Sequence, residues 1–373
     1  MDEREAYLLL WLTVRSVKGI GLVQARSLIG DWKTTAPGAT LSAGDWRERN
    51  APPSLCQALV AAFRSEEPSA LVARIRASGV SLVSDRDEHY PMLLKEIAAA
   101  PPFLFYYGTL PEKQLNVGIV GTRTCSAYGR KAAFEIASTL ADTGVGVVSG
   151  LAYGVDKAAH EGALMGAGVT VAVLGSGVDA VYPREHRRLA DQIVAARGCV
   201  MSEFLPWTGP QSYQFPQRNR IISGLSQAIV IIEAGERSGA LITAAYALEQ
   251  NRDVLAVPGS IFSDRSRGTN ALIVEGARPV LSAGDVLDAI GYTGRSGAHF
   301  VQGEMTEWAG LPAIQQCVLA ELSASERTLG ELQEAAVSGG FSRRELFEAI
   351  TALELASLIV HSEGTYAQAT PKL

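Results

Sequence analysis

The sequence predicts an α/β protein in which a doubly wound, mostly parallel sheet is flanked in the chain by two smaller, helical parts. Three observations predict it. Short β-branched apolar runs alternate with helical stretches in the middle of the chain, the first 80 residues carry only helical periodicity, and the last segment has three helical stretches followed by a strand. A chain of 373 residues that is 47% hydrophobic and 19% charged is long enough for two or three compact domains.

Residues 1–80 are predicted to form a small helical domain, because apolar positions recur at helical spacing in YLLLWLTV, VQARSLIG and LCQALVAAF. Within it, the segment from Val17 to Gly30 has the Gly-x-Gly turn of a helix-hairpin-helix. Such a turn can offer backbone N–H groups to a phosphate, or it can simply hold two helices of a small core together. The sequence leaves both interpretations open.

Residues 81–290 are predicted to form the sheet domain. Its strands are near-continuous apolar runs, which is typical of strands that are buried on both faces. Helical stretches such as KAAFEIASTLADTG and GALITAAYALEQ lie between most of them, so the pattern indicates a Rossmann-like domain. The predicted strands are NVGIVG, GVGVVSG, TVAVLGSG, AIVIIEA and DVLAVPG.

The C-terminal part is predicted to consist of a glycine-rich linker at 291–305 and a winged-helix domain at 306–373. Ser342, with Glu345 three residues later, forms a predicted capping box at the start of the third helix, and a short wing turns at Gly364. From Met305 onward there are 4 basic and 9 acidic residues, the opposite of what a helix that approaches phosphates needs. This balance favours a role in protein contacts or in stabilising a dimer.

Charge and cysteine content limit the function classes. The net charge is −6, but residues 121–220 carry 10 basic against 8 acidic residues, so any site for an anion must be local to the middle of the chain. The four cysteines lie far apart without a CxxC pair, which argues against disulfides and zinc. No apolar run approaches the roughly 18 residues that span a bilayer, and the amino terminus is acidic, so we expect a cytoplasmic protein.

The loops after the strands should carry the function, because ligands of doubly wound sheets bind beyond the carboxyl ends of the strands. Small residues there let backbone N–H groups approach an anion, helix N-termini add partial positive charge, and arginines add full charges. Aromatic residues in the same loops could stack on bases, each stack contributing about 1–3 kcal/mol. The arginines are Arg123, Arg184, Arg218 and Arg220, and the aromatic residues are Tyr128, Tyr153, Tyr182, Tyr213 and Phe215.

Cofactor and enzyme interpretations are weaker. GIVGTR does not match GxGxxG, the second strand ends without an acidic residue, and no P-loop occurs, so no cofactor is predicted. Asp156, His160 and Glu161 share a helical turn but lack a further metal ligand, and Asp156 is better explained as a helix N-cap, so no metal is predicted. Glu233 could be a general base or could cap the following loop.

Taken together and in order, these loops resemble the DprA/Smf family of DNA processing proteins. The matching stretches span about 115 to 285, and YPMLLKEIAAAPPFLFYYG before them is also similar to the family. They are GTRTCSAYGR, VSGLAYGVDKAAHEGAL, TVAVLGSGVDAVYP, FPQRNRIISGLS, VIIEAGERSGALITAAYALEQNRDVLAVPG and GTNALIVEGARPV. The family's three-part layout of a sterile-alpha-motif-like helical domain, a Rossmann-like domain and a winged helix agrees with the predicted boundaries.

The resemblance implies a protein, not an enzyme, that binds single-stranded DNA without sequence preference, protects it and loads the RecA recombinase onto it in natural transformation (competence) and recombination. It also implies a homodimer, and a single-strand-binding protein is a further candidate partner. The predicted DNA-contacting residues are Gly121, Thr122, Arg123, Ser149, Gly150, Gly175, Arg184, Phe215, Arg218, Asn219 and Arg220.

The apolar run ALIVEGA, with Leu272 and Ile273, is a candidate dimer surface, or else an edge element of the core. If Arg123, Arg184, Arg218 and Arg220 each neutralise one phosphate, log affinity should fall with log salt at a slope of roughly −3. The rival interpretation is a nucleotide-processing enzyme of the lysine-decarboxylase-like Rossmann group. However, VPGS at Val257 to Ser260 matches that group's PGGxGT signature poorly.

Overall fold

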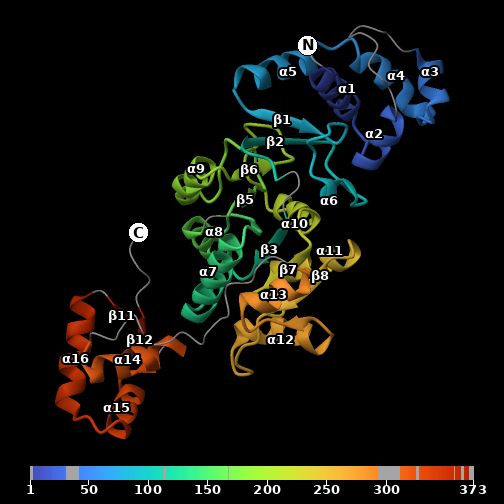
Figure 1. Ribbon diagram of the computed structural model, residues 1–373. Helices are drawn as coiled ribbons and strands as arrows, with labels where there is room; N and C mark the ends of the chain where they lie inside the picture. Colours follow the sequence, from blue (N-terminus) through green and yellow to red (C-terminus); the bar gives the residue numbers. More distant parts are fainter. Residues whose placement is uncertain are drawn as a thin grey trace.

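The computed structural model describes residues 3–30, 42–111, 115–166, 168–292, 311–324, 327–356, 358–362 and 365–368. Its centre is a nine-stranded sheet with the strand order β1-β2-β6-β5-β4-β3-β7-β8-β9 (Figure 1). The sheet is parallel except at β1 and β2, so the predicted α/β fold with a mostly parallel sheet is confirmed. The predicted linker at 291–305 lies, apart from its first two residues, outside the described residues.

Within residues 3–30 and 42–80, five helices precede the sheet, as the helical periodicity of the first 80 residues predicts. They share one apolar core with Phe103 and Phe105 of β2 and with Val178, so the helical layer packs on the antiparallel edge of the sheet. Arg74 of α5 also stacks on Trp207, which lies in the loop after β6. The helices are α1 (Glu3–Ser16), α2 (Leu22–Ile29), α3 (Ala43–Glu48), α4 (Pro53–Ala62) and α5 (Glu67–Ala77).

The five predicted strands are all present, as β3 (Asn116–Val120), β4 (Gly146–Ser149), β5 (Thr170–Val173), β7 (Ala228–Ile231) and β8 (Asp253–Ala256). Apart from Asp253, every residue in them is buried, as their continuous apolar sequences predict. The sequence analysis missed the remaining four: β1 (Ser81–Ser84), β2 (Phe103–Gly108), β6 (Cys199–Ser202) and β9 (Arg278–Pro279).

Helices cover both faces of the sheet. On one face, α7 (Ala127–Asp142), α8 (Val155–Met165) and α13 (Ala283–Ala289) pack on Val117 and Ile119 of β3. On the other face, α6 (Met92–Lys95), α10 (Gln214–Gly224) and α11 (Gly239–Glu249) share a core with Val120. Because α7 follows β3 and α11 follows the adjacent β7, the chain leaves these two neighbouring strands toward opposite faces, which creates a crevice at their carboxyl ends.

Two further helices complete this part. The first, α9 (Arg187–Ala195), follows a single turn, η1 (Arg184–His186), and packs on β5, β6 and β2. The second, α12 (Arg267–Val274), follows a second turn, η2 (Asp264–Ser266), and packs beside β8. Within the described ranges, no helix is long and apolar enough to cross a membrane.

The C-terminal part has its own apolar core, made by three helices and a small antiparallel sheet of order β10-β12-β11. The predicted capping box is confirmed, since the Ser342 hydroxyl accepts from the Glu345 N–H while the Glu345 carboxylate accepts from Ser342. The predicted wing turn at Gly364 lies outside the described residues. The elements are α14 (Ala313–Ala324), β10 (Arg327–Thr328), α15 (Leu329–Ser338), α16 (Arg343–Leu355), β11 (Ile359–Ser362) and β12 (Thr365–Gln368).

Candidate nucleic-acid interface

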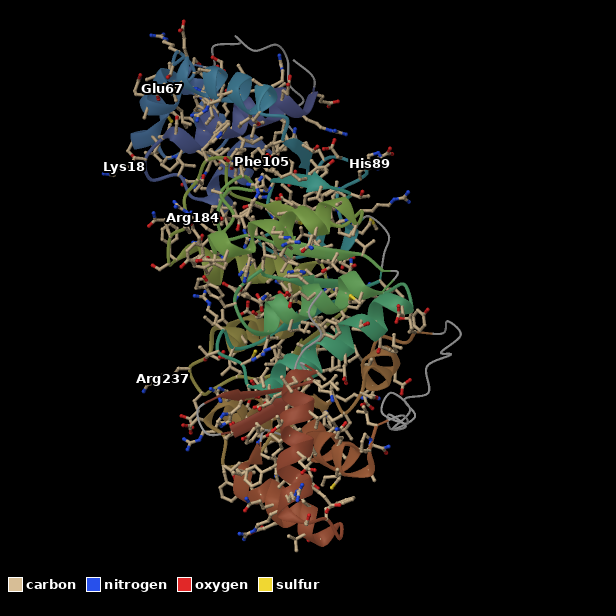
Figure 2. All side chains as sticks on the ribbon, turned by 90° about the vertical axis from the view of Figure 1, so that its left-hand side faces the viewer. Lys18, Glu67, His89, Phe105, Arg184 and Arg237 are labelled. Atoms are coloured by element: carbon tan, nitrogen blue, oxygen red, sulfur yellow. The ribbon has the colours of Figure 1, made fainter. Side chains whose placement is uncertain are left out.

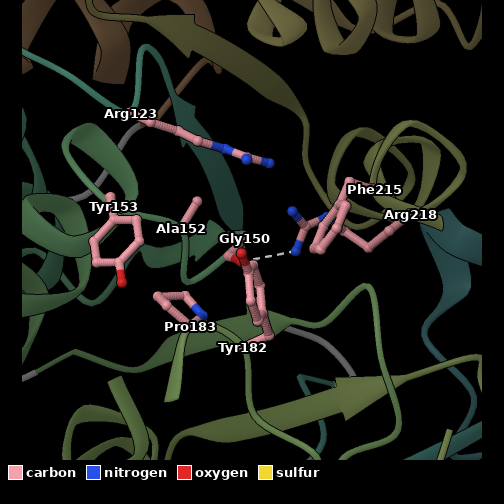
Figure 3. Close-up of a pocket in the computed structure, with 8 residues that line it drawn as sticks. All are labelled: Arg123, Gly150, Ala152, Tyr153, Tyr182, Pro183, Phe215 and Arg218. Atoms are coloured by element: carbon pink, nitrogen blue, oxygen red, sulfur yellow. Dashed lines mark hydrogen bonds between the residues drawn. The ribbon is translucent and has the colours of Figure 1, made fainter. Parts of the chain in front are cut away.

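The loops at the carboxyl ends of β3, β4, β5 and β7, together with the first turns of α10, form a surface that we call the crest. Two depressions lie in it. A hollow of about 30 Å³ is enclosed by side chains of three loops and α10 (Figure 3), and a wider groove of about 700 Å³ adjoins it between α10 and α11. The hollow is lined by Arg123, Gly150, Ala152, Tyr153, Tyr182, Pro183, Phe215 and Arg218.

Glu233 at the end of β7 fixes the loop that carries Arg123. Its carboxylate accepts from the Ser126 N–H at 2.9 Å and from the Ser126 hydroxyl at 2.6 Å, while its carbonyl accepts from the Thr122 N–H at 2.8 Å. Ser126 is in turn the N-cap of α7 and accepts from the Gly129 N–H. Of the two roles that the sequence left open for Glu233, these contacts favour the structural one, because both carboxylate oxygens are engaged.

Gly154 lets the β4 loop lie against the β3 loop. Its φ of 74° lies in the left-handed region, and a Cβ there would meet the backbone of Thr122 and Arg123. Immediately after it, the Val155 N–H donates to the Thr122 carbonyl at 3.3 Å. Gly154 is also the N-cap of α8, so the prediction that Asp156 caps this helix is wrong.

Arg218 lines the hollow and Asp156 lines the adjoining groove. We call this buried pair the floor, because both side chains bond the backbone of Gly150. The Asp156 carboxylate accepts from the N–H groups of Gly150 at 3.1 Å and Ala152 at 3.3 Å, and Arg218 donates to the Gly150 carbonyl at 2.8 Å. Burial lowers the pKa of Arg218 to about 10 and raises the pKa of Asp156, while the opposite charge of each partner counteracts the shift.

Arg218 and Arg220, the predicted phosphate contacts, both have internal partners in this structure. Arg218 is only 4% exposed and also donates to the Val173 carbonyl, so it supports the floor and presents only part of its guanidinium to the hollow. Arg220 donates to Glu203 at 2.6 Å, and the two side chains are only 12% and 13% exposed. An arginine committed to a buried carboxylate is not available to neutralise a phosphate.

By contrast, Arg123, Tyr182 and Arg184 are exposed, and we define these three residues as the rim of the crest. The Arg123 guanidinium lies 5.3 Å from the centroid of the Phe215 ring, and the Tyr182 ring lies 5.6 Å from the same ring at an angle of 46°. Figure 3 shows Arg123 reaching over the hollow toward Arg218. Arg184 projects from the same side of the molecule as Lys18 and Arg237 (Figure 2).

Two other predicted contact residues are buried and serve the packing of the crest. The Ser149 hydroxyl donates to the Ile119 carbonyl, and Gly175 allows the close approach of the Phe215 ring, because a Cβ there would lie 2.8 Å from Cδ1 of that ring. Both residues are buried in this conformation, and their contacts with DNA stay predictions. Gly121 and Thr122 are half-buried and line the groove.

Asn219, which the sequence also selected, lies in the groove, where its amide accepts from Arg218 and donates to the Gly239 carbonyl at 3.3 Å. The sequence analysis missed Glu185, an exposed acid beside Arg184 that accepts from the Tyr153 hydroxyl at 2.9 Å. A hydrogen bond from its own backbone N–H and, second, the bond from Tyr153 lower the pKa of Glu185, so this carboxylate adds a negative charge beside Arg184.

His160 and Asp156, the candidate metal ligands, face different partners. His160 is fully buried, and its Nδ1 lies 2.7 Å from the Thr170 hydroxyl. Burial lowers the pKa of His160 to about 3, so the ring is neutral. Both side chains thus hold the fold together.

The candidate dimer residues Leu272 and Ile273 are half-buried in α12, and Leu272 packs against the sheet core. Their neighbours are more exposed: Val274 is 89% exposed and Phe262, in the loop before α12, is 91% exposed. Asn270 ties that loop to α12 through two hydrogen bonds with Gly259. The exposed apolar surface of this segment therefore centres on Val274, which lies in the selected run ALIVEGA, and on Phe262, which lies outside it.

Comparisons with known proteins agree with the fold and the loops. The family model of DNA recombination-mediator protein A matches residues 81–291. Protein Smf of Synechocystis is 35% identical over 78% of this chain and 73% of its own length, and DNA processing protein DprA of Streptococcus pneumoniae is 46% identical over 54% of this chain and 71% of its own.

Two solved structures are also similar. The structure of DprA from Streptococcus pneumoniae has a TM-score of 0.65 at 35% identity and covers 77% of this chain and 98% of its own. A structure of DNA processing protein A from Helicobacter pylori, described with its single-stranded DNA binding mode, has a TM-score of 0.51 at 27% identity over 56% of this chain and 94% of its own.

Proposed function

The chain belongs to the DNA recombination-mediator protein A family, and we propose that it binds single-stranded DNA on the crest. The observation that carries the proposal is the rim, where the exposed Arg123 stands beside the rings of Tyr182 and Phe215 over the hollow. A second exposed arginine, Arg184, follows Pro183 of the hollow in the chain. Phosphate contacts give affinity without sequence preference, and rings can stack on any base. The DNA processing proteins that resemble this chain, including the Helicobacter pylori protein with its single-stranded DNA binding mode, support the same function.

In the proposed complex, Arg123 and Arg184 contact the phosphates while Tyr182 offers its exposed ring to a base. Duplex DNA would bind less well, because the faces of its bases are covered by neighbouring base pairs. Since Arg218 and Arg220 are committed to internal partners, two phosphates are neutralised rather than four. The slope of log affinity against log salt should then be about −1.4 per protomer instead of −3.

We also propose that the protein protects the strand and loads RecA onto it during transformation and recombination, as the resemblance to DprA implies. We propose that it does so as a homodimer, with the segment 259–274 as the contact surface because Phe262 and Val274 expose apolar side chains there. Two linked crests would bind one strand more tightly than either alone. Sedimentation velocity of Phe262→Ser is the direct test: loss of the dimer supports this surface, and an unchanged dimer rejects it.

We also propose that residues 1–80, 81–290 and 306–373 form three domains with different roles. The shared core with β2 supports a helical part that acts together with the crest, because the loop after β5 contributes Val178 to that core. The C-terminal part has a separate core, and Arg344 on its third helix is paired with Glu348 at 2.9 Å. We propose that it contacts proteins rather than DNA.

The rival function, hydrolysis of a nucleotide, loses its candidate base. Both oxygens of the Glu233 carboxylate accept from Ser126 at hydrogen-bond distance, so they support the loop instead of facing a substrate.

The test of the proposal is a binding titration of labelled oligo-dT and a matched duplex, followed by a RecA filament-assembly assay on the coated oligo-dT. We expect preference for the single strand, and faster filament assembly when the protein is present. Equal affinity for both forms would reject the crest as a single-strand site, and unchanged assembly would reject RecA loading alone.

A further inference from the structure

The wider groove between α10 and α11 is a second feature of the crest, which adjoins the hollow and shares Arg123, Phe215 and Arg218 with it. It extends from the β3 loop to the first turns of α11, into a region where the sequence analysis placed no binding residue. Its volume of about 700 Å³ falls in the range of small-molecule sites, whereas the hollow has room for little more than a water molecule. The α11 side of the groove is lined by Ser238, Gly239, Ala240, Ile242 and Thr243.

The groove lies at the crevice where α7 and α11 leave β3 and β7 toward opposite faces of the sheet. Doubly wound sheets bind ligands at such a crevice, and a helix that starts there points its partial positive charge at the ligand. Here α11 begins at Gly239 with Ser238 as its N-cap, whose hydroxyl accepts from the Ala240 N–H. For the Gly239 N–H, the described part of the chain offers no acceptor.

Thr243 gives an independent indication that a ligand binds here. The residue lines the groove and is 1% exposed, and its hydroxyl has no hydrogen-bond partner among the residues that the structure describes. A buried hydroxyl without a partner destabilises a fold. Another buried helical threonine avoids that cost, since Thr13 is 4% exposed and donates to the Leu9 carbonyl. The Thr243 hydroxyl is therefore a hydrogen-bonding group at the wall of the groove that no described residue of the fold uses.

The charges around the groove suit an anion. Arg123 lines it as well as the hollow, and the acid that lines it, Asp156, is engaged by two backbone N–H groups and compensated by Arg218. Glu236, in the loop before α11, is paired with Arg267 at 3.7 Å. Beyond the polar mouth, the walls carry the apolar side chains of Pro216, Ile222 and Ile242.

We infer that this groove binds one nucleotide, with its phosphate at the N-terminus of α11 and its base against the apolar walls, where Thr243 supplies a hydrogen bond. The inference rests on the proposed function, because it assigns the groove to the same single-stranded DNA that contacts the rim. A nucleotide phosphate could belong to that strand or to a free nucleotide, and the chemistry of recognition is the same for both.

Gly239 allows a test that separates binding from folding. A Cβ at this position would meet no atom within 4 Å, and the position is the first residue of a helix, where a negative charge favours the helix. Gly239→Glu should therefore fold at least as well as Gly239→Gln, its uncharged match in size. With a phosphate beside this residue, we expect oligo-dT to bind Gly239→Glu about tenfold more weakly than Gly239→Gln. Ala245→Glu, on an exposed position of the same helix, controls for a general effect of charge.

Thr243→Val removes the hydroxyl and keeps the shape. Its melting temperature should equal or exceed that of the wild type, while its affinity for oligo-dT falls about tenfold and Thr243→Ser retains most of the affinity. Calorimetric titration with dTMP assigns the source of the phosphate: binding that Gly239→Glu abolishes indicates a free nucleotide, and loss confined to oligo-dT indicates the strand.

Equal affinities of Gly239→Glu and Gly239→Gln, or wild-type affinity of Thr243→Val, would overturn the inference. Arg123→Ala tells this failure apart from a failure of the proposed function. If Arg123→Ala loses oligo-dT and the groove variants do not, only the groove assignment is wrong. If the wild type itself does not bind oligo-dT, the proposed function is wrong as well.

Discussion

Arg123 on the rim is exposed and lies over a ring, whereas Arg218 in the floor, in the same hollow, is 4% exposed and donates to two backbone carbonyls. The floor keeps its charges paired and its polar groups bonded, while the rim leaves charge and aromatic surface in contact with solvent. Residue type alone therefore does not assign a role in the crest loops. An arginine in a crest loop can hold the loop in shape or hold a ligand, and burial decides which.

The largest expected effect is on the floor. Arg218→Met should lower the free energy of unfolding by about 3 kcal/mol, because it leaves the buried Asp156 carboxylate without its compensating charge. Urea denaturation measures this change. Asp156→Asn combined with Arg218→Met should lose less than the sum of the two single variants. Additive losses would mean that the two side chains are not coupled.

On the rim, Arg123→Ala should leave the free energy of unfolding within about 0.5 kcal/mol of the wild type, since the side chain is exposed. Its affinity for oligo-dT should fall about twentyfold, because a charge-assisted contact to a phosphate is lost. Anisotropy titration and thermal denaturation together check the prediction. A variant that binds normally but unfolds more easily would place Arg123 with the floor.

His160, a buried residue of α8, makes the free energy of unfolding depend on pH. Its folded pKa of about 3 lies below the unfolded value of about 6.5, so its contribution is complete above pH 6.5 and is lost as pH falls toward 3. The loss from this group should be about 1.4 kcal/mol at pH 5.5 relative to pH 7.5. His160→Asn, which can still donate to Thr170, should unfold with a smaller difference between these two pH values. An equal difference in both proteins would assign the dependence to another group.

The smallest effect is expected in the C-terminal part, where α16 carries Arg343 and Arg344 in an acidic surrounding. Arg343→Ala with Arg344→Ala should change the affinity for oligo-dT less than twofold, which is under about 0.4 kcal/mol. The anisotropy assay used for Arg123→Ala applies unchanged. A loss of affinity for oligo-dT as large as that of Arg123→Ala would show that the DNA also contacts α16.

The sequence predicted the elements with strong periodicity better than the edges of the sheet. The five predicted strands lie in apolar runs of the sequence, whereas Cys199–Ser202, with the same length as four of them, has only three apolar residues before Ser202 and Glu203. β1 and β2 are strands because they complete the sheet and cover the N-terminal helices, which is a tertiary effect.

For the site, the crest loops were predictable because parallel strands end at the same edge, but the roles of individual residues were not. Arg220 and Arg123 look equivalent in sequence, and only the fold brings Glu203 to within 2.6 Å of Arg220. Thr243, in turn, was not selected from the sequence, because no motif distinguishes it from any other helical threonine. Its significance comes from a missing hydrogen bond and a neighbouring groove.

The salt dependence of oligo-dT binding counts the phosphates that the rim neutralises. We expect a slope of log affinity against log salt of about −1.4 for the wild type and about −0.7 for both Arg123→Ala and Arg184→Ala, with Arg220→Met leaving the slope unchanged if the variant folds. A slope that neither rim variant changes would contradict the account, because the strand would then be held somewhere other than the crest.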